Sequence, residues 1–393
     1  MRLARRKIVS LFLCGLTICS FRGYTVCNPS LPSAKPAPKT TSIKVPSGIS
    51  ESLWRLRTPP DNPLSPEKVE LGRALFFDKR LSSDGTVSCG LCHDPAFAFT
   101  DANRLATGVR DRKGTRNTPT ILNAMFSERF FWDGRAASLE EQVLHPISSP
   151  FEMGMESKQH LIDRVSSITE YRRQFKRVFK TEGITLETIA KAIAAYERTI
   201  LSGNSAFDLF IAGNQSAISE TQRRGWELFK GKARCIECHT YSQSTPFFTD
   251  FKFHNTGIAA TDSLFAVLIE NLPRSSLAKR PTIMAHSDGF SELGRYAITY
   301  QLNDIGAFKT PTLRDVELTS PFMHNGSLGT LLDVVNFYNR GGNANPYLDE
   351  RMRPLGLADG EVNDLVEFMR SLTSKDVLKQ CQTAKPQKRA ARS

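Results

Sequence analysis

One five-residue motif occurs twice in the chain, as CGLCH at residues 89–93 and as CIECH at residues 235–239. In a helical turn this spacing places two thiols where they can add to the two vinyl groups of a haem, and the adjacent histidine can then bind the iron. We therefore predict two covalently bound c-type haems. Their expected binding residues are Cys89, Cys92 and His93 for the first, and Cys235, Cys238 and His239 for the second.

Paired cysteines also bind zinc or form redox-active disulfides. A zinc site would not require a histidine directly after both pairs, and the separation of 146 positions between Cys89 and Cys235 far exceeds the spacing of a zinc ribbon. A redox disulfide leaves both histidines unexplained as well. We therefore expect haem rather than zinc or a disulfide.

The formal net charge of +12 comes from the two ends of the chain. Residues 1–50 hold eight lysines and arginines and no acidic residue, and residues 375–393 hold six basic residues and one aspartate. The chain between these ends is nearly neutral and has an ordinary globular composition. This distribution argues against a nucleic-acid-binding protein.

Residues 1–27 predict an export signal or an N-terminal anchor. Four basic residues precede the apolar run IVSLFLCGLTICSF, which is too short to span a bilayer comfortably. No A-x-A cleavage site follows, so the segment is either cleaved elsewhere or kept as a tether to the inner membrane. Cys14, Cys19 and Cys27 are read here as apolar filler. Because haem is attached covalently outside the cytoplasm, we expect a periplasmic protein.

The remaining chain is expected to consist of a linker, two domains and a tail. Residues 28–50 are rich in Pro, Ser and Lys and predict a linker. Residues 51–205 contain the first motif and residues 206–374 the second, and residues 375–393 predict a basic, disordered tail in which Cys381 is a lone exposed thiol. GRALFF and GWELFK, which precede the two motifs, suggest that the domains are duplicates.

The hydrophobic pattern indicates a mostly α protein. Apolar residues recur at spacings of three and four, whereas the alternation typical of strands is almost absent. Ser219 is a candidate N-cap. Helices are predicted within residues 67–78, 185–201, 219–229, 330–338 and 359–372. The expected fold is two cytochrome c-like domains, each with one covalently bound c-type haem.

Four further segments carry a resemblance to a known family. They are GTRNTPTILNAMF (114–126), FWDGRAASLEEQVLHPISSPFEM (131–153), FKTPTLRDVELTSPFMHNGSL (308–328) and LLDVVNFYNRGG (331–342). Together with the haem motifs, they make the chain similar to the di-haem cytochrome c peroxidase/MauG superfamily from about Leu71 to Leu372. In that family the N-terminal haem reacts with peroxide and the C-terminal haem passes electrons.

The resemblance implies a peroxidatic site around the first motif, with His93 as proximal ligand. Glu152 falls at the family's distal glutamate, and Gln142 and Pro146 are the other markers of that pocket. A carboxyl beside the iron can take a proton from bound H2O2 and return it to the departing oxygen. Trp132 falls at the tryptophan between the haems, where an indole can relay electrons.

The chain departs from ordinary bacterial peroxidases at the position of their removable distal histidine. Val109 stands there, and no histidine lies between His93 and His145. We therefore expect the first iron to be five-coordinate and to need no reductive activation.

The second haem differs from the peroxidase pattern as well. The resemblance implies His239 as proximal ligand, and where peroxidases supply a methionine this chain has Tyr338. A tyrosinate oxygen is a hard, anionic ligand that lowers the haem potential, and it points to the MauG branch. Met323 and His324 are rival ligands; we expect Met323 to pack in the core and His324 to lie near the haem edge.

The resemblance also implies an inter-haem calcium site, and it bears on whether the chain can pass holes to a protein substrate. Asn117, with the carbonyls of Thr319 and Pro321, matches the calcium ligands, which are all oxygens. Ala233 stands where MauG has the surface tryptophan that passes holes to its protein substrate, so that route is not supported here. The other histidines are expected to be structural or on the surface: His145, His160, His254 and His286.

These features predict an oxidoreductase that reduces H2O2 at the first haem. Electrons would come through the second haem from a small periplasmic cytochrome c or cupredoxin. The alternative is a MauG-like enzyme that uses peroxide to oxidise side chains of a partner protein, and a non-catalytic electron carrier is the third hypothesis. Tyr338 favours the MauG-like activity and Ala233 argues against it, while Glu152 and Gln142 argue against a plain carrier.

Overall fold

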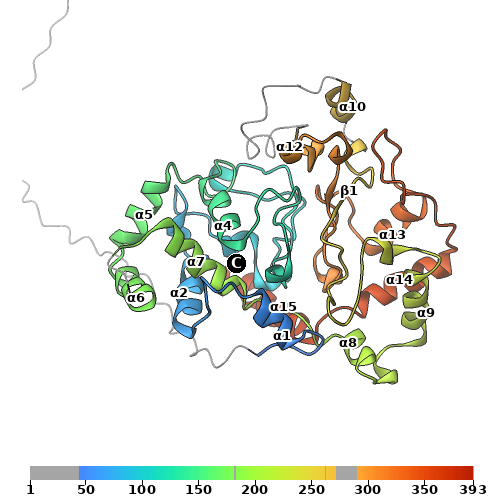
Figure 1. Cartoon of the computed structure of the whole chain (residues 1–393), viewed down its shortest axis with the longest axis horizontal. Coiled ribbons are helices and arrows are strands. Elements are labelled where there is room, and N and C mark those ends of the chain that lie inside the picture. The colour runs from blue at the N-terminus through green and yellow to red at the C-terminus, as the bar shows by residue number, and fades with distance from the viewer. Residues whose placement is uncertain (1–43, 181–182, 262, 271–289, 393) are drawn as a thin grey trace, which may run out of the picture. The chain divides into compact units, whose positions relative to one another are not determined.

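The computed structural model describes residues 44–180, 183–261, 263–270 and 290–392. In these residues the protein is mostly α-helical, with long connecting loops, as Figure 1 shows. The helices are α1 (Glu51–Arg57), α2 (Pro66–Phe76), α3 (Cys89–Cys92), α4 (Leu139–Ser148), α5 (Lys158–Ser167), α6 (Thr169–Phe179), α7 (Leu186–Glu197), α8 (Ala206–Ile211), α9 (Glu220–Lys230), α10 (Ser263–Glu270), α12 (Tyr296–Thr299), α13 (Leu331–Asn339), α14 (Asp359–Arg370) and α15 (Lys375–Arg392).

The described strands form one short antiparallel pair. β1 (Phe253–His254) pairs with β2 (Phe308–Lys309), with Phe253 opposite Lys309. The prediction of a mostly α protein is therefore confirmed, and each of the five predicted helical segments contains a helix with nearly the expected bounds.

Side-chain caps explain where the main helices begin. Ser65, Thr185, Ser219 and Thr330 each accept a hydrogen bond from a backbone N–H in the first turn of the helix that follows. Such a cap satisfies one of the four N–H groups that a helix start leaves without an intrahelical partner. The prediction of Ser219 as N-cap is confirmed, with a reciprocal bond from its own N–H to Gln222 Oε1 at 3.0 Å.

Each half of the chain is organised around one pair of crossing helices. In the first half α2 packs on α7, and in the second α9 packs on α14. A glycine lies at each crossing, because a Cβ on Gly72 would come within 1.8 Å of the Ala192 carbonyl oxygen and one on Gly225 within 2.0 Å of the Asp364 oxygen. The absence of a side chain at both glycines lets the helix backbones approach closely.

The two halves repeat more of their local structure than the short echo in the sequence suggested. Thr118-Pro119-Thr120 and Thr310-Pro311-Thr312 form corresponding loops, and the bridge of Phe130 with Ala136 corresponds to that of Phe322 with Leu328. The helices that follow, α4 and α13, also correspond. Their N-caps, Ser138 and Thr330, lie the same number of residues after Thr118 and Thr310. At this constant spacing Pro146 on α4 is the counterpart of Tyr338 on α13.

The core divides between the halves in the same way. One buried cluster comes from residues 69–200 together with Val377 and Cys381 near the C-terminus, and another comes from residues 207–372. Two smaller clusters, one around Phe126 and Phe247 and one around Phe265 and Phe308, complete the core of the described residues.

The C-terminal segment differs from the predicted disordered tail. Lys375–Arg392 form α15, which packs on the turn Pro95–Phe97 beside the first motif. Val377 and Cys381, one helical turn apart, are buried in the first core cluster, so the prediction of an exposed thiol is wrong. The charge of the segment hid two apolar residues at helical spacing, and their burial depends on a surface far earlier in the chain.

The linker predicted at residues 28–50 is described from residue 44 onward. There Ile49 is buried, and the Ser47 carbonyl accepts a hydrogen bond from the Asn204 N–H at 2.7 Å, so this end of the segment packs against the body. The predicted signal at residues 1–27, with its three cysteines, lies outside the described residues. Every helix in the described part of the chain is too short or too polar to cross a membrane.

Candidate haem-binding site

The first motif lies on the short helix α3 and the residue that follows it. The His93 N–H donates to the Cys89 carbonyl at 2.8 Å, which closes the turn. The His93 ring makes a hydrogen bond from Nδ1 to the Phe99 carbonyl at 3.1 Å. Because Nδ1 is used in this way, Nε2 is the nitrogen available to an iron, and the carbonyl fixes both tautomer and ring orientation.

The second motif has the same construction. The His239 N–H donates to the Cys235 carbonyl at 2.9 Å, and His239 Nδ1 bonds to the Phe248 carbonyl at 2.9 Å. Both carbonyls come from a Phe-Thr-Asp sequence, residues 99–101 and 248–250, that follows its motif. Burial lowers the pKa of His93 and of His239, which keeps each imidazole neutral, as an iron ligand must be.

The motif cysteines line two different cavities rather than one shared site. Cys89 and Cys92 line a cavity of about 220 Å³, and Cys235 and Cys238 line a cavity of about 260 Å³. All four are free thiols, and burial raises the pKa of Cys92 and of Cys235 to about 12. This separation does not fit a single four-cysteine zinc site, whereas a cavity with two thiols and one oriented imidazole fits a c-type haem.

The first cavity brings together the predicted peroxidatic residues. Its lining includes His93 with Gln142, Pro146 and Glu152, and Trp132 belongs to its wall. Gln142 and Pro146 come from α4, and Glu152 comes from the turn that follows this helix. Residues from distant parts of the sequence thus surround one cavity beside the first motif.

The Glu152 backbone is held on both sides. Its N–H donates to the Ser149 carbonyl at 3.1 Å, and its carbonyl accepts from the Val109 N–H at 2.8 Å. Val109 is buried, so the loop in which ordinary peroxidases carry a distal histidine packs here on the glutamate segment through an apolar side chain. Among the described lining residues of this cavity, His93 is the one histidine.

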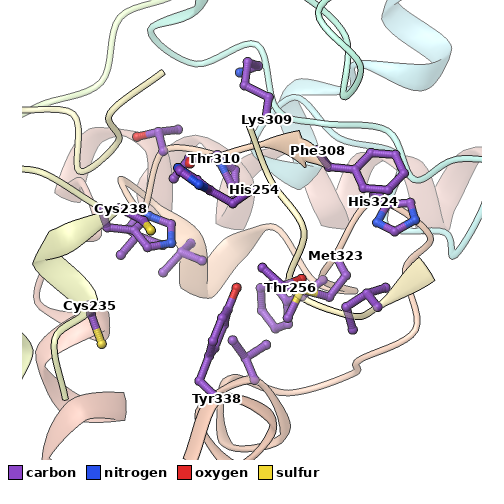
Figure 2. A pocket seen from close by; sticks show the side chains of 18 of the residues that line it. Cys235, Cys238, His254, Thr256, Phe308, Lys309, Thr310, Met323, His324 and Tyr338 are labelled. Carbon is purple, nitrogen blue, oxygen red and sulfur yellow. The ribbon is translucent and has the colours of Figure 1, made fainter. Parts of the chain in front are cut away.

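Tyr338 and His239 line the second cavity together. Figure 2 shows the Tyr338 side chain rising from its helix with the hydroxyl pointing into this cavity. Burial and the nearby motif thiols raise the pKa of Tyr338, so ionisation of this phenol requires a positive partner such as a metal ion.

The two rival ligands are also at this cavity. His324 is buried, its Nε2 lies 2.8 Å from Glu292 Oε2, and its ring stacks on Phe308 at a centroid distance of 3.5 Å. These contacts occupy the imidazole and agree with a position at the edge of the site. Met323 lines the same cavity with a positive φ of 73°.

The two cavities share a wall. Trp132 and Lys309 line both, and the Lys309 N–H donates to the Trp132 carbonyl at 2.8 Å. The indole Nε1 donates to the Asn117 carbonyl at 2.9 Å, which orients the ring. On its other side, the indole lies edge-on to His324 at a centroid distance of 6.5 Å.

A buried charge cluster fixes the chain next to Trp132. Asp133 is fully buried and bonds to Arg116 at 2.6 Å and to Arg135 at 2.8 Å. Burial alone would raise the pKa of Asp133, but the two guanidinium groups overcome it and hold the pKa at about 2. The carboxylate therefore stays ionised and anchors the loop that carries the tryptophan.

The predicted calcium residues lie at one edge of the second cavity. Asn117, Thr319 and Pro321 all line it. The Asn117 amide donates from Nδ2 to the carbonyls of Asn103 and Arg104, at 2.9 and 3.4 Å. This orientation leaves Oδ1 as the amide atom that could bind a cation.

Ala233 and the other histidines lie in different surroundings. Ala233 is buried at the second cavity. His145 is half-buried against Phe131, and His160 is partly exposed at the start of α5. His254 is held between Asp250 and Asp349, at 2.8 Å from each. His286 lies outside the described residues.

Two residues of the cavities escaped the sequence analysis. Glu197 lines the first cavity. Its position in the sequence could have revealed it, because it is an acidic residue on the apolar face of α7, four positions after Ile193. Lys309 lies in the shared wall, where burial lowers its pKa to about 8. No feature of its own sequence segment marks this half-buried lysine as part of a cavity wall.

Comparisons with known proteins agree with this geometry. A family model described as di-haem cytochrome c peroxidase matches residues 66–216. The chain is 39% identical to the methylamine utilization protein MauG of Methylorubrum extorquens, over 80% of each chain. It is 37% identical to the cytochrome-c peroxidase IdrP1 of Denitromonas iodatirespirans, over 81% of this chain and 85% of that one.

A solved structure extends the match to the fold. It is described as a MauG-like protein associated with microbial copper homeostasis, and it superposes with a TM-score of 0.67 at 31% identity, covering 86% of this chain and 96% of that one. The paired haem motifs, the two adjoining cavities and these similarities lead to one conclusion: the chain belongs to the di-haem cytochrome c peroxidase family.

Proposed function

We propose that this protein is a periplasmic di-haem oxidoreductase that reduces H2O2 at its first haem. The proposal rests mainly on one difference between the two cavities. At corresponding positions the first cavity has Pro146 and the second has Tyr338. Proline has no side chain that can bind iron, whereas tyrosine does. The first site is thereby left with room for a small oxidant, and the second site is closed.

The residues suit two covalently attached c-type haems, each with an oriented proximal histidine. When bound, the haem irons would supply the peroxide-binding site and the redox centre that accepts and donates single electrons. Cys89 and Cys92 would hold the first haem, with His93 as ligand. The corresponding residues of the second site are Cys235, Cys238 and His239, and Tyr338, which lines the same cavity, would be a further iron ligand.

Within the first cavity, the proposed acid–base group is Glu152. Its segment is fixed by the hydrogen bonds to Ser149 and Val109, so the carboxyl is presented from a rigid turn. There it would take one proton from H2O2 and return it to the departing oxygen. Gln142 and Pro146 shape the cavity next to it.

Electrons would cross the shared wall by way of Trp132. The indole is held by Asn117 and stands between the two cavities, so it shortens the route through protein from one to the other. The proposed donor at the second haem is a small periplasmic cytochrome c or a cupredoxin. Asn117 Oδ1, with the carbonyls of Thr319 and Pro321, is the proposed calcium site in the same region.

MauG-like oxidation of a partner protein is the second candidate. The observation that favours it is Tyr338, a hard anionic ligand that stabilises oxidised iron. Ala233 argues for the peroxidase, because it offers no aromatic relay and is buried. Both candidate functions include export by the N-terminal segment, which is then either removed or kept as a membrane tether.

Spectroscopy of the exported holoprotein tests the proposal. Mass spectrometry should show two covalent haems, and EPR should show one high-spin five-coordinate and one low-spin haem. Stoichiometric H2O2 should change both signals, and steady-state turnover with reduced cytochrome c separates the peroxidase from the MauG-like enzyme. Two six-coordinate haems that are inert to peroxide would overturn the proposal and leave an electron carrier.

A further inference from the structure

Glu197 is a buried acid at the wall of the first cavity. It is the last residue of α7, its exposed fraction is 4%, and Oε2 has no hydrogen-bond partner among the described residues. The mechanism proposed above does not use it. A carboxyl in such surroundings is costly to ionise, because burial removes its water and no hydrogen bond to Oε2 replaces that water.

The second half of the chain has a methionine at the equivalent position. The Gly72 crossing aligns Ala192 and Tyr196 of α7 with Asp364 and Phe368 of α14, which surround the Gly225 crossing in the same way. The residue after Tyr196 is Glu197, and the residue after Phe368 is Met369, which lines the second cavity. The two haem sites therefore differ by one ionisable group at this place.

The charged groups around Glu197 do not compensate it. Arg198, the nearest cation, is bound to Glu140 on α4 through two hydrogen bonds of 2.7 and 2.9 Å. Glu140 itself repels a carboxylate, and within the described residues α2 and α5, which also pack on α7, add no charged group that acts on Glu197. Burial is the largest influence on Glu197. The charge of Arg198 opposes it and that of Glu140 adds to it, and the net result raises the pKa of Glu197 to about 8.

The carboxyl also acts on the attachment point of the first haem. Burial raises the pKa of the Cys89 thiol, and the next largest cause is the charge of Glu197. A charge at Glu197 therefore changes the electrostatic potential at Cys89, through which this haem would be attached.

We propose that Glu197 is a redox-linked proton site of the first haem. Oxidation of a bound haem by H2O2 would add one positive charge near Glu197 and favour its carboxylate. Glu197 would then release one proton to solvent as one electron passes to the peroxide. Reduction reverses the exchange: one electron arrives from the donor and one proton from solvent. Because the coupling is reciprocal, the pH must shift the reduction potential of this haem as the haem shifts the proton affinity of Glu197. The second haem, with Met369, lacks this group.

This inference rests on the proposed function, and potentiometry of the holoprotein tests it. The potential of each haem is followed spectroscopically between about pH 6 and pH 9, where the carboxyl titrates. In the wild type the first-haem potential should fall with pH, with a slope approaching about 59 mV per tenfold change in proton concentration. Glu197→Gln keeps the shape and removes the proton, and Glu197→Met installs the residue of the other half. Both should flatten the slope of the first haem and leave the second haem unchanged.

The reverse substitution provides the matched gain of function. Met369→Glu should give the second haem a pH-dependent potential that it lacks in the wild type. A redox difference infrared spectrum should show a protonated carboxyl band in the wild type and none in Glu197→Gln.

Two failures can be told apart. A chain that carries no covalent haem by mass spectrometry would overturn the proposed function itself. A haem-loaded protein whose first-haem slope is the same in the wild type and in both Glu197 variants would overturn this inference alone.

Discussion

Replacing Glu152 by glutamine is the sharpest test of the first cavity. Glutamine has nearly the same shape, and the Glu152 backbone bonds to Ser149 and Val109 do not involve the side chain, so the turn should keep its conformation. The variant loses the ability to accept a proton and return it. General acid–base catalysis contributes about 10²- to 10⁴-fold to a rate, which corresponds to about 3–5 kcal/mol of barrier.

The assay is stopped-flow mixing of the holoprotein with H2O2, with the rate read from the Soret band of the first haem. The Glu152→Gln rate should be lower by about 10²-fold or more, while the spectrum of the resting protein stays unchanged. Glu156→Gln is the matched control, because this nearby glutamate has a side chain that is 78% exposed and does not line the cavity. A Glu152→Gln rate within a few fold of the control would refute the proposed role.

Three further predictions concern the second haem and stability. Tyr338→Phe should convert the second haem from low-spin to high-spin in EPR, and an unchanged low-spin signal would mean that another residue is the ligand. Asp208→Ala should lower the free energy of unfolding by about 3–5 kcal/mol, because it leaves the buried Arg314 without its paired carboxylate; denaturant unfolding followed by circular dichroism measures this. Because the folded-state pKa of Glu197 is raised to about 8, its contribution to stability is present below about pH 4.5 and is lost as the pH rises through 8. The melting temperature of Glu197→Gln should therefore fall less over this range than that of the wild type.

Much of the site could be read from local sequence because its chemistry is local. The Cys-x-x-Cys-His spacing places thiols and imidazole in one turn, and the structure adds only the Phe99 and Phe248 carbonyls that orient the rings. The helices were predictable for the same reason, since apolar spacing and caps such as Ser219 act within a few residues.

What escaped prediction depends on contacts between distant segments. Cys381 was expected to be exposed, because nothing near it in sequence shows the surface around Pro95 that covers it. Lys309 was not predicted as a cavity residue, because only the fold places β2 in the wall between the two cavities. Burial of a charged residue is a property of its neighbours in space, and a single sequence does not name them.

By itself, the sequence determined two haem motifs, a mostly α fold and the family to which the chain is similar, since these follow from short-range spacing and from segment identity. Only the tertiary structure decided that Pro146 and Tyr338 occupy equivalent places in the two halves, and that Glu197 takes in one half the place that Met369 takes in the other. The reason is physical: corresponding helices cross at corresponding glycines, whereas the side chains at these positions differ. The difference between the two sites therefore becomes visible only when the halves are compared as folded units.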